Sequence, residues 1–166
     1  LSSVSISEGA KSLGRNTFNR CTSLASINIP SSVSSIEAGT FGGCSGLTGV
    51  TIQRGVVSIE ENAFSNCSKL ASVTFPDSVT SIRDNAFDQC TGLTSVTIPS
   101  SVSSVGAYAF DGCSSLSRLS LAEGVTSLTT INFTGTQAQW NAIDGVALAG
   151  IPNTAVITYN YVPPAP

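Results

Sequence analysis

Apolar positions repeat along this chain with a constant period of 23 positions, the step from Cys21 to Cys44. Phenylalanine, cysteine and leucine each form one column of the repeat, and the three columns keep the same register from copy to copy. Their members are Phe18, Phe41, Phe64, Phe87 and Phe110; Cys21, Cys44, Cys67, Cys90 and Cys113; and Leu1, Leu24, Leu47, Leu70, Leu93 and Leu116. Three columns in a single register predict a tandem repeat in which each copy is one structural unit.

The pattern within one copy predicts short strands joined by turns. In residues 93–113, Val96 and Ile98 alternate with threonine, which is typical of a strand with one buried face. The proline after Ile98 cannot donate to a strand ladder, so the strand should end there. A second apolar pair at 102–105 predicts another short extended segment. The Ala-Phe-x-x-Cys stretch at 109–113 then predicts a single helical or 3₁₀ turn.

Such copies predict a β-rich solenoid. One coil cannot bury its apolar side alone, but stacked coils bury a continuous column. Neighbouring strands in register lie about 4.8 Å apart, so about six coils would form a rod roughly 30 Å long. The predicted core is a set of ladders, with leucine on leucine, phenylalanine on phenylalanine and cysteine on cysteine.

The repeat changes toward the C-terminal end. The strand motif that begins at Leu128 follows Leu116 after only about half the usual interval, and we interpret this as a coil whose second half is skipped. Thr136 can cap a short helix whose Trp140 and Ile143 share one face. The predicted division is a solenoid of about six coils at 1–135, a cap of short helix, loop and strand (155–162) at 136–162, and a proline-rich tail at 163–166.

The pattern C-x-x-L-x-x-[VI]-x-I-P-x-S-V-x-x-I-x-x-x-A-F-x-x-C resembles the BspA-type leucine-rich repeat of bacterial and protozoan surface proteins. The Gly-Thr-x-x-Gln-Trp-x-x-Ile element at 135–143 also resembles an end element of such proteins. The resemblance implies a right-handed solenoid with a parallel sheet and short turns or helices opposite it. It further implies an extracellular or cell-surface location and adhesion to proteins or cells. The family offers no shared catalytic residue.

Composition narrows the function classes. Only 10% of the residues are charged, and 28 serines and 17 threonines take their place. The net charge of −3 disfavours nucleic acid, which requires a basic face. No apolar run is long enough to insert into a membrane. The chain has no histidine, which excludes histidine-based catalysis, and no serine lies in a nucleophile motif. We therefore expect neither an enzyme nor a cofactor.

The five cysteines are expected to be reduced and buried. Side chains in a parallel ladder point the same way, which disfavours disulfides, and the odd number would leave one cysteine unpaired. The sequence contains no C-x-x-C pair of a zinc site and no D-x-D-x-D-G loop of a calcium site. Buried cysteine behaves as a small hydrophobic residue, so we expect no metal site.

The outward column of the predicted strands is the candidate interaction face. It comprises Ser5, Asn28, Thr51, Thr74, Thr97, Ser120 and Asn132, and Arg118 lies beside it. We take Thr51, Thr74, Thr97, Arg118 and Ser120 as the candidate site. Binding hot spots favour tryptophan, tyrosine and arginine, and this face offers only Arg118. The predicted function is adhesion or protein–protein interaction, and the alternative is a structural spacer or self-assembling filament subunit.

The first coil of the repeat begins at Leu1, and its apolar column would be open on one side. Solenoids need terminal caps, because an open coil exposes core residues and unpaired strand edges. Two arrangements would cover it: further coils upstream in the natural chain, or a head-to-tail contact with another copy. The second could use the C-terminal strand at 155–162 of a neighbour.

Overall fold

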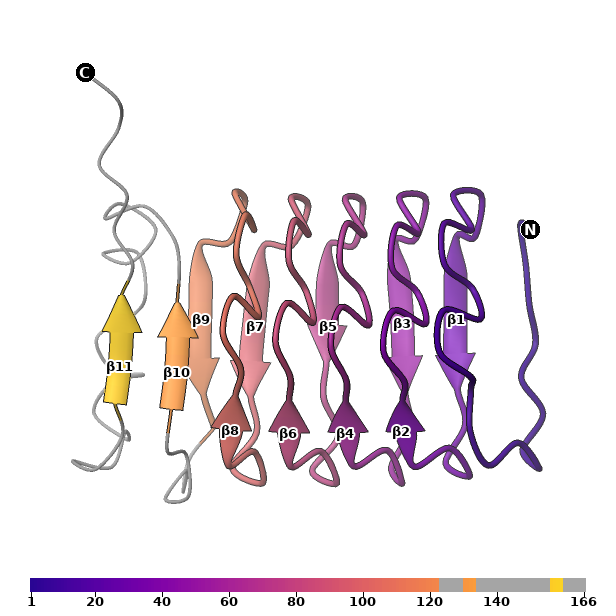
Figure 1. Cartoon of the computed structure of the whole chain (residues 1–166), viewed down its shortest axis with the longest axis horizontal. Helices are drawn as coiled ribbons and strands as arrows, with labels where there is room; N and C mark the ends of the chain where they lie inside the picture. Colours follow the sequence, from indigo (N-terminus) through magenta and orange to yellow (C-terminus); the bar gives the residue numbers. More distant parts are fainter. Residues whose placement is uncertain (123–129, 134–155, 160–166) are drawn as a thin grey trace.

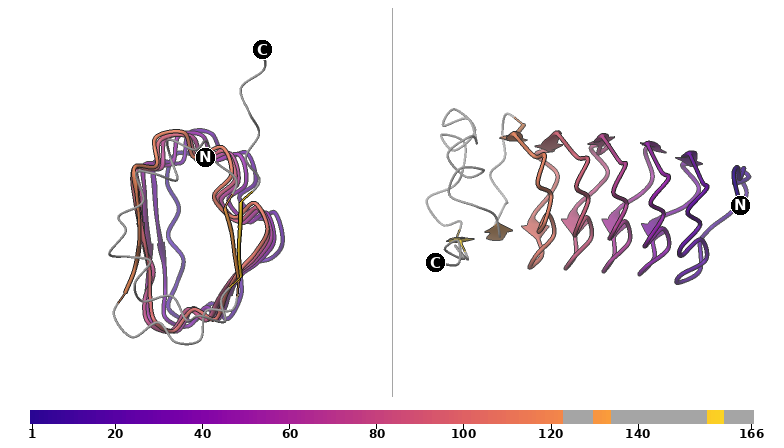
Figure 2. Two further views of the ribbon diagram at one scale, coloured as in Figure 1. Left: turned by 90° about the vertical axis from the view of Figure 1, so that its left-hand side faces the viewer. Right: turned by 90° about the horizontal axis from the view of Figure 1, so that it is seen from above.

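The computed structural model describes residues 1–122, 130–133 and 156–159, and it is a parallel β-solenoid (Figure 1). Viewed along its axis, successive coils superpose closely (Figure 2). One series of strands consists of β1 Ser26–Ile29, β3 Gly49–Ile52, β5 Ser72–Thr74, β7 Ser95–Ile98 and β9 Arg118–Leu121. The other consists of β2 Ser35–Ile36, β4 Ser58–Ile59, β6 Ser81–Ile82, β8 Ser104–Val105, β10 Thr130–Phe133 and β11 Val156–Tyr159. The predicted solenoid is confirmed.

One copy of the repeat makes one coil. The first series forms the sheets β1-β3 and β5-β7-β9, and the second forms one six-stranded sheet in the order β11-β10-β8-β6-β4-β2. All strand pairs are parallel, and from β1 to β9 each residue pairs with its equivalent in the next copy, as Ser72 does with Ser95. Equivalent residues of neighbouring coils therefore lie side by side.

The interpretation of the segment after Leu121 is wrong. β10 pairs with β8, with Ile131 opposite Val105, so it continues the six-stranded sheet. The second half of that coil is present, and Asn132 does not belong to the column of Thr97. Apolar alternation fits a strand of either sheet, whereas chain order leads from β9 to the opposite sheet. The strand predicted at 155–162 is present as β11, which pairs with β10. The predicted helix at 136–143 lies outside the described residues.

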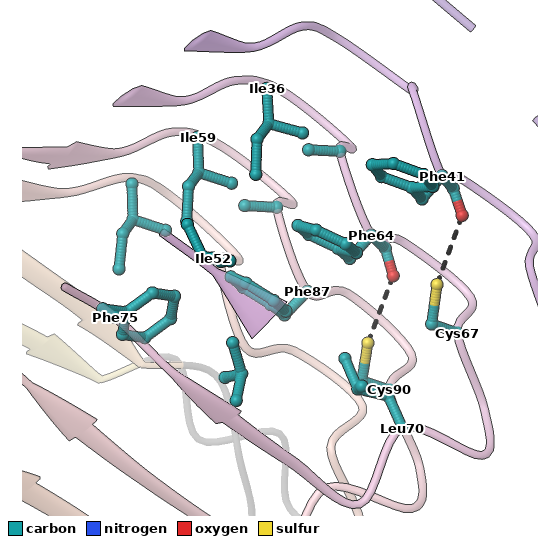
Figure 3. Packing of buried hydrophobic residues seen from close by; sticks show 14 of the residues in the cluster. Ile36, Phe41, Ile52, Ile59, Phe64, Cys67, Leu70, Phe75, Phe87 and Cys90 are labelled. Carbon is teal, nitrogen blue, oxygen red and sulfur yellow. Dashed lines mark hydrogen bonds between the residues drawn. The ribbon is translucent and has the colours of Figure 1, made fainter. Parts of the chain in front are cut away.

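The core consists of the predicted ladders (Figure 3). Phenylalanine rings of successive coils stack with centroids 5.2 to 5.4 Å apart and planes within 13° of parallel. Phe75 adds an edge-on contact to Phe87 at 5.6 Å. Phe41, Phe64 and Phe87 are fully buried. The repeat length therefore places each ring on the next one, which gives a continuous aromatic column.

The segments between the second and first strand series are successive turns. No helix occurs in the parts of the chain that the structure describes, so the expected helical or 3₁₀ turn is not formed. Each of these turn segments contains two residues in the left-handed conformation, four positions apart, as at Asn62 and Asn66. As a result, every second backbone N–H group points to the next coil. The N–H of Cys44 bonds to Phe41 O within the coil, while the N–H of Phe41 bonds to Ala63 O in the next coil. A helix would use all its N–H groups internally and leave none to join the coils.

Serine and threonine hydroxyls also join neighbouring coils. In four exposed residues, the hydroxyl donates to a backbone carbonyl that lies one repeat earlier in the sequence. These are Thr48 to Ala25 O at 3.0 Å, Thr94 to Ala71 O at 3.2 Å, Ser117 to Thr94 O at 3.2 Å and Ser103 to Thr80 O at 3.1 Å. A surface poor in charge thus remains polar and adds hydrogen bonds between coils.

Candidate interaction surfaces

The outward face of the first strand series carries the predicted site residues. We call it the strand face and define it by Thr51, Thr74, Thr97, Arg118 and Ser120. Thr74, Thr97 and Ser120 are direct neighbours across β5, β7 and β9, and Arg118 lies opposite Ser95. Thr51 lies on β3, opposite Asn28 of β1. The threonines and Arg118 are exposed and Ser120 is partly buried, so the structure presents all five on one surface.

The strand face is flat and almost neutral. Its side chains are short, and Arg118 is the single charge among them. At the edge of this face, Arg54 pairs with Asp77 at 2.8 Å, and both side chains are largely exposed. Gln53 Nε2 donates to Asn28 Oδ1 at 3.3 Å. The edge therefore adds an ion pair and the Gln53 amide to the short side chains of the strand face.

The cysteines form a buried column without reactive character. The thiol of Cys67 donates to Phe41 O of the preceding coil at 3.2 Å, and the thiol of Cys90 donates to Phe64 O at 3.2 Å (Figure 3). Burial raises the pKa of Cys44 to about 11 and that of Cys67 to about 12. Such thiols stay protonated at neutral pH and are poor nucleophiles.

The prediction of reduced, buried cysteines is confirmed for four of the five. None of the five forms a disulfide, and Cys21 is partly exposed because its coil is the first to carry a cysteine. In the described ranges, no three His, Cys, Asp or Glu side chains converge to hold a metal ion. Those ranges also contain no helix of the length and apolarity that a bilayer crossing requires.

A second surface feature was missed by the sequence reasoning. It is a groove of about 820 Å³ on the turn segments of three successive coils. The middle coil contributes Gly39, Gly42 and Gly43 to its floor, and we call it the glycine groove. Its lining residues are Arg15, Asn16, Asn19, Arg20, Ala38, Gly39, Gly42, Gly43, Ser45, Glu61, Asn62, Ser65, Asn66 and Ser68.

The groove exists because one coil lacks side chains where its neighbours have them. The three columns read Asn16, Gly39, Asn62; Asn19, Gly42, Ser65; and Arg20, Gly43, Asn66. A Cβ atom built on Gly39 would collide with the Asn16 amide, and one on Gly42 would lie 2.9 Å from Asn19 Nδ2. Asn19 Nδ2 also approaches Gly39 O at 3.4 Å. The side chains of the first coil thus lean over the glycines of the second.

The charged side chains of the groove are Arg15, Arg20 and Glu61, and all three are exposed. Within the described residues the ion pairs involve Arg54 and Arg83, so neither groove arginine has a carboxylate partner there. The groove therefore carries an excess of one positive charge in a chain whose net charge is −3. The signal in the sequence was the three glycines at 39, 42 and 43, where the other copies carry Asn, Ser, Asp, Gln, Arg or Tyr and repeat a glycine only at Gly112.

Comparison with known proteins identifies the repeat. The family model described as the BspA type Leucine rich repeat region matches residues 1–116 and 35–144, with six copies. No curated protein sequence is significantly similar to the chain. Leucine-rich repeats of this kind generally mediate protein–protein interaction through their extended surfaces.

Solved structures of bacterial proteins share the fold. A leucine rich cell surface protein from Faecalibacterium prausnitzii is 31% identical, with a TM-score of 0.69, over 85% of this chain and 34% of that protein. The T. pallidum leucine rich repeat protein is 26% identical, with a TM-score of 0.68, over 87% of this chain and 80% of that one. The pneumococcal vaccine antigen PcpA, 17% identical with a TM-score of 0.65, shares the fold over 97% of this chain and 42% of its own length. The chain thus spans most of one relative and about a third of another.

Proposed function

This chain belongs to the BspA-type leucine-rich repeat family, and on that premise we propose that it is a non-enzymatic, extracellular recognition module that binds a protein through its strand face. The likeness to a cell surface protein at 31% identity supports an extracellular location. The burial of four cysteines and the lack of histidine support a non-enzymatic role.

Rigidity of the strand face supports protein binding. Its strands are hydrogen-bonded in register within the sheets β1-β3 and β5-β7-β9, and their inward residues, such as Val73 and Val96, are buried in the core. Serine and threonine have few rotamers, so ordering them against a partner costs little conformational entropy. A preformed flat surface of this kind suits a partner that is itself folded.

The observation that carries the proposal is Arg118. It interrupts a column of small residues, namely Ser26, Gly49, Ser72 and Ser95. Its side chain is exposed, and no ion pair involves it among the described residues. Arginine is enriched at binding hot spots because its guanidinium offers several donors in a fixed plane. A residue of this kind on a neutral face gives a partner a point of anchorage.

The size of the face sets the kind of interaction. Five strands of about four residues cover roughly 300 Å², compared with about 800 Å² per partner in a standard interface. The contact therefore extends over the adjoining edge with Arg54 and Asp77 or stays weak. Weak single contacts suit adhesion, in which many copies on one surface act together.

A test uses an array of immobilised extracellular proteins and the fluorescent, full chain. We expect the unmodified chain to bind a subset of the array, and Thr97→Lys or Arg118→Ala to weaken that binding about tenfold. Thr80→Lys, next to β6 on the opposite sheet, is the matched control and should bind normally. The melting temperature of each variant confirms that it is folded.

Two outcomes would contradict the proposal. If Thr97→Lys binds as well as the unmodified chain, the strand face is not the binding surface. If the unmodified chain binds nothing but forms polymers in light scattering, the alternative of a spacer or filament subunit is favoured. The uniform Ser/Thr columns of β5 and β7 would suit that alternative.

A further inference from the structure

We propose that the glycine groove is a second binding site, separate from the strand face, and that it takes a saccharide bearing a carboxylate group, such as a uronic or sialic acid residue. Its volume of about 820 Å³ lies within the range of small-molecule sites, roughly 300 to 1,000 Å³. The inference does not depend on protein binding at the strand face.

The shape of the groove follows from the repeat. Its two walls are turn segments of coils that are two repeats apart, so they are separated by roughly 10 Å. The backbone of the glycine coil forms the floor between them. The side chains of Asn16, Asn19 and Arg20 occupy the space that side chains at Gly39, Gly42 and Gly43 would fill, so a ligand meets these three polar side chains above the glycine backbone. The turn hydrogen bonds between coils, such as Gly39 N to Glu61 O at 2.9 Å, hold the floor in place.

The polar groups of the walls match a sugar. Four asparagine amides line the groove and can donate to and accept from ring hydroxyl groups, although Asn19 Nδ2 also donates to Gly39 O and Asn66 Nδ2 to Ser65 Oγ. Serine hydroxyls add groups that can donate or accept. The lining has no aromatic residue, and Ala38 is its only apolar side chain, so it lacks the pockets that a peptide's apolar side chains or a hydrophobic small molecule would need. The four asparagines are Asn16, Asn19, Asn62 and Asn66.

The charged groups specify a carboxylate. A guanidinium binds a carboxylate through two parallel hydrogen bonds, and Arg15 and Arg20 are both available for this. Glu61 on the opposite wall leaves the groove with an excess of one positive charge and can accept hydrogen bonds from ring hydroxyls. This balance fits a ligand with one carboxylate better than a polyanion, which Glu61 would repel.

The neighbouring coils lack these features. In the column of Asn19, Gly42 and Ser65, the next two coils carry Asp88 and Asp111, whose negative charges would repel a carboxylate. In the column of Gly39 the fourth and fifth coils carry Asn85 and Tyr108 in place of glycine. The site is therefore confined to residues 15–68, where the repeat departs from its own pattern.

Isothermal titration tests the inference with matched pairs of probes on the full chain. The pairs are 3′-sialyllactose with lactose, and galacturonic acid with galactose, so each acidic probe carries one carboxylate. We expect at least one acidic sugar to bind about tenfold more tightly than its neutral counterpart, because the carboxylate–guanidinium hydrogen bonds are lost in the latter. The pair that responds tells whether a sialic or a uronic acid is preferred.

Variants locate the site. Arg20→Gln should weaken binding of the acidic sugar about tenfold. Gly43→Asn should abolish it by filling the groove, and its backbone is compatible because Asn66 has the same left-handed conformation one coil later. Gly42→Ser, which repeats the side chain of Ser65 in the next coil, serves if Gly43→Asn does not fold. Arg83→Gln, which removes an exposed arginine outside the groove lining and the strand face, is the control and should bind normally.

Three results would overturn the inference: equal binding of acidic and neutral sugars, no binding of either acidic sugar, or binding that survives Gly43→Asn and Gly42→Ser. Tetraglutamate is a further probe, and if it competes as well as the acidic sugars, the groove recognises an acidic peptide and the saccharide assignment is overturned. None of these results affects protein binding at the strand face, which the protein array measures separately.

Discussion

Replacing Phe64 with alanine is the most informative test of the aromatic column. Phe64 is 0% exposed and lies between Phe41 and Phe87, with both ring centroids 5.2 Å away. Large-to-small replacement of a buried phenylalanine costs about 3–5 kcal/mol, because transfer free energy is lost and a cavity remains. Each stacked pair contributes about 0.5–1.5 kcal/mol beyond burial, and this variant breaks two. We therefore expect a loss near the upper end of the range, about 4–5 kcal/mol.

Urea unfolding followed by far-ultraviolet circular dichroism measures this loss. Thr74→Ala on the strand face is the control, and its free energy of unfolding should change by less than about 0.5 kcal/mol. Because each coil contacts only its neighbours, removal of the central ring should also uncouple the two halves, which would appear as a broader or two-step transition. A loss below about 2 kcal/mol for Phe64→Ala, or equal losses for both variants, would refute the stacked-ladder account.

Four further predictions concern thiol reactivity, the pH dependence of stability, backbone strain and close packing. In the native state the four buried cysteines should resist a thiol reagent while Cys21 reacts, and equal reactivity of all five would contradict this. Because burial raises the folded pKa of Cys44, Cys67 and Cys113 to about 11 or 12, above the ordinary value of 9.0, the stability that these thiols contribute should be full below pH 9 and fall as pH rises toward the folded values. Tyr108, 44% exposed in a left-handed conformation, is strained, so Tyr108→Asn should raise the melting temperature through a gain of about 1 kcal/mol, and a lowered melting temperature would argue against strain. Gly46→Ala should lower the free energy of unfolding in urea by about 1–3 kcal/mol, because the new Cβ would collide with Thr22 O. Gly49→Ala, which has open space around it, should change this free energy by less than about 0.5 kcal/mol. Equal losses in the two variants would be inconsistent with the packing.

The repeat period was enough to predict the coil, the core ladders and the register. A constant spacing between equivalent residues leaves one in-register way to stack Phe64 on Phe41 and Phe87, and each strand pair from β1 to β9 follows it. The strand face could be predicted for the same reason, since alternation about Val96 fixes Thr97 as an outward residue.

The turn conformation and the place of β10 could not be predicted in this way. The spacing between Phe64 and Cys67 suits a helical turn and the observed successive turns equally well. Seven of the ten left-handed positions in these turns hold Asn or Gly, which adopt this conformation readily, but Arg20, Gln89 and Tyr108 interrupt the pattern. For β10, apolar alternation does not say which of two parallel sheets a strand joins.

The glycine groove escaped prediction because it is defined by missing side chains. The repeat is recognised from residues that recur at equivalent positions. Gly39, Gly42 and Gly43 stand at positions where most other copies carry a side chain. Its charged residues, Arg15 and Arg20, belong to a different coil from the glycines, and only the stacking of coils brings them together. Departures from a repeat are therefore as informative about function as the repeat is about fold.

The central claim is that recognition occurs where the surface departs from the repeat. Chemical-shift mapping by ¹H–¹⁵N NMR, with 3′-sialyllactose and galacturonic acid titrated in turn into the isotopically labelled full chain, tests it most directly. The account predicts that at least one of them shifts the amide signals of residues 15–20, 39–45 and 61–68 and leaves those of Thr51, Thr74 and Thr97 unchanged. Shifts on the strand face instead, or no shifts with either sugar, would contradict it.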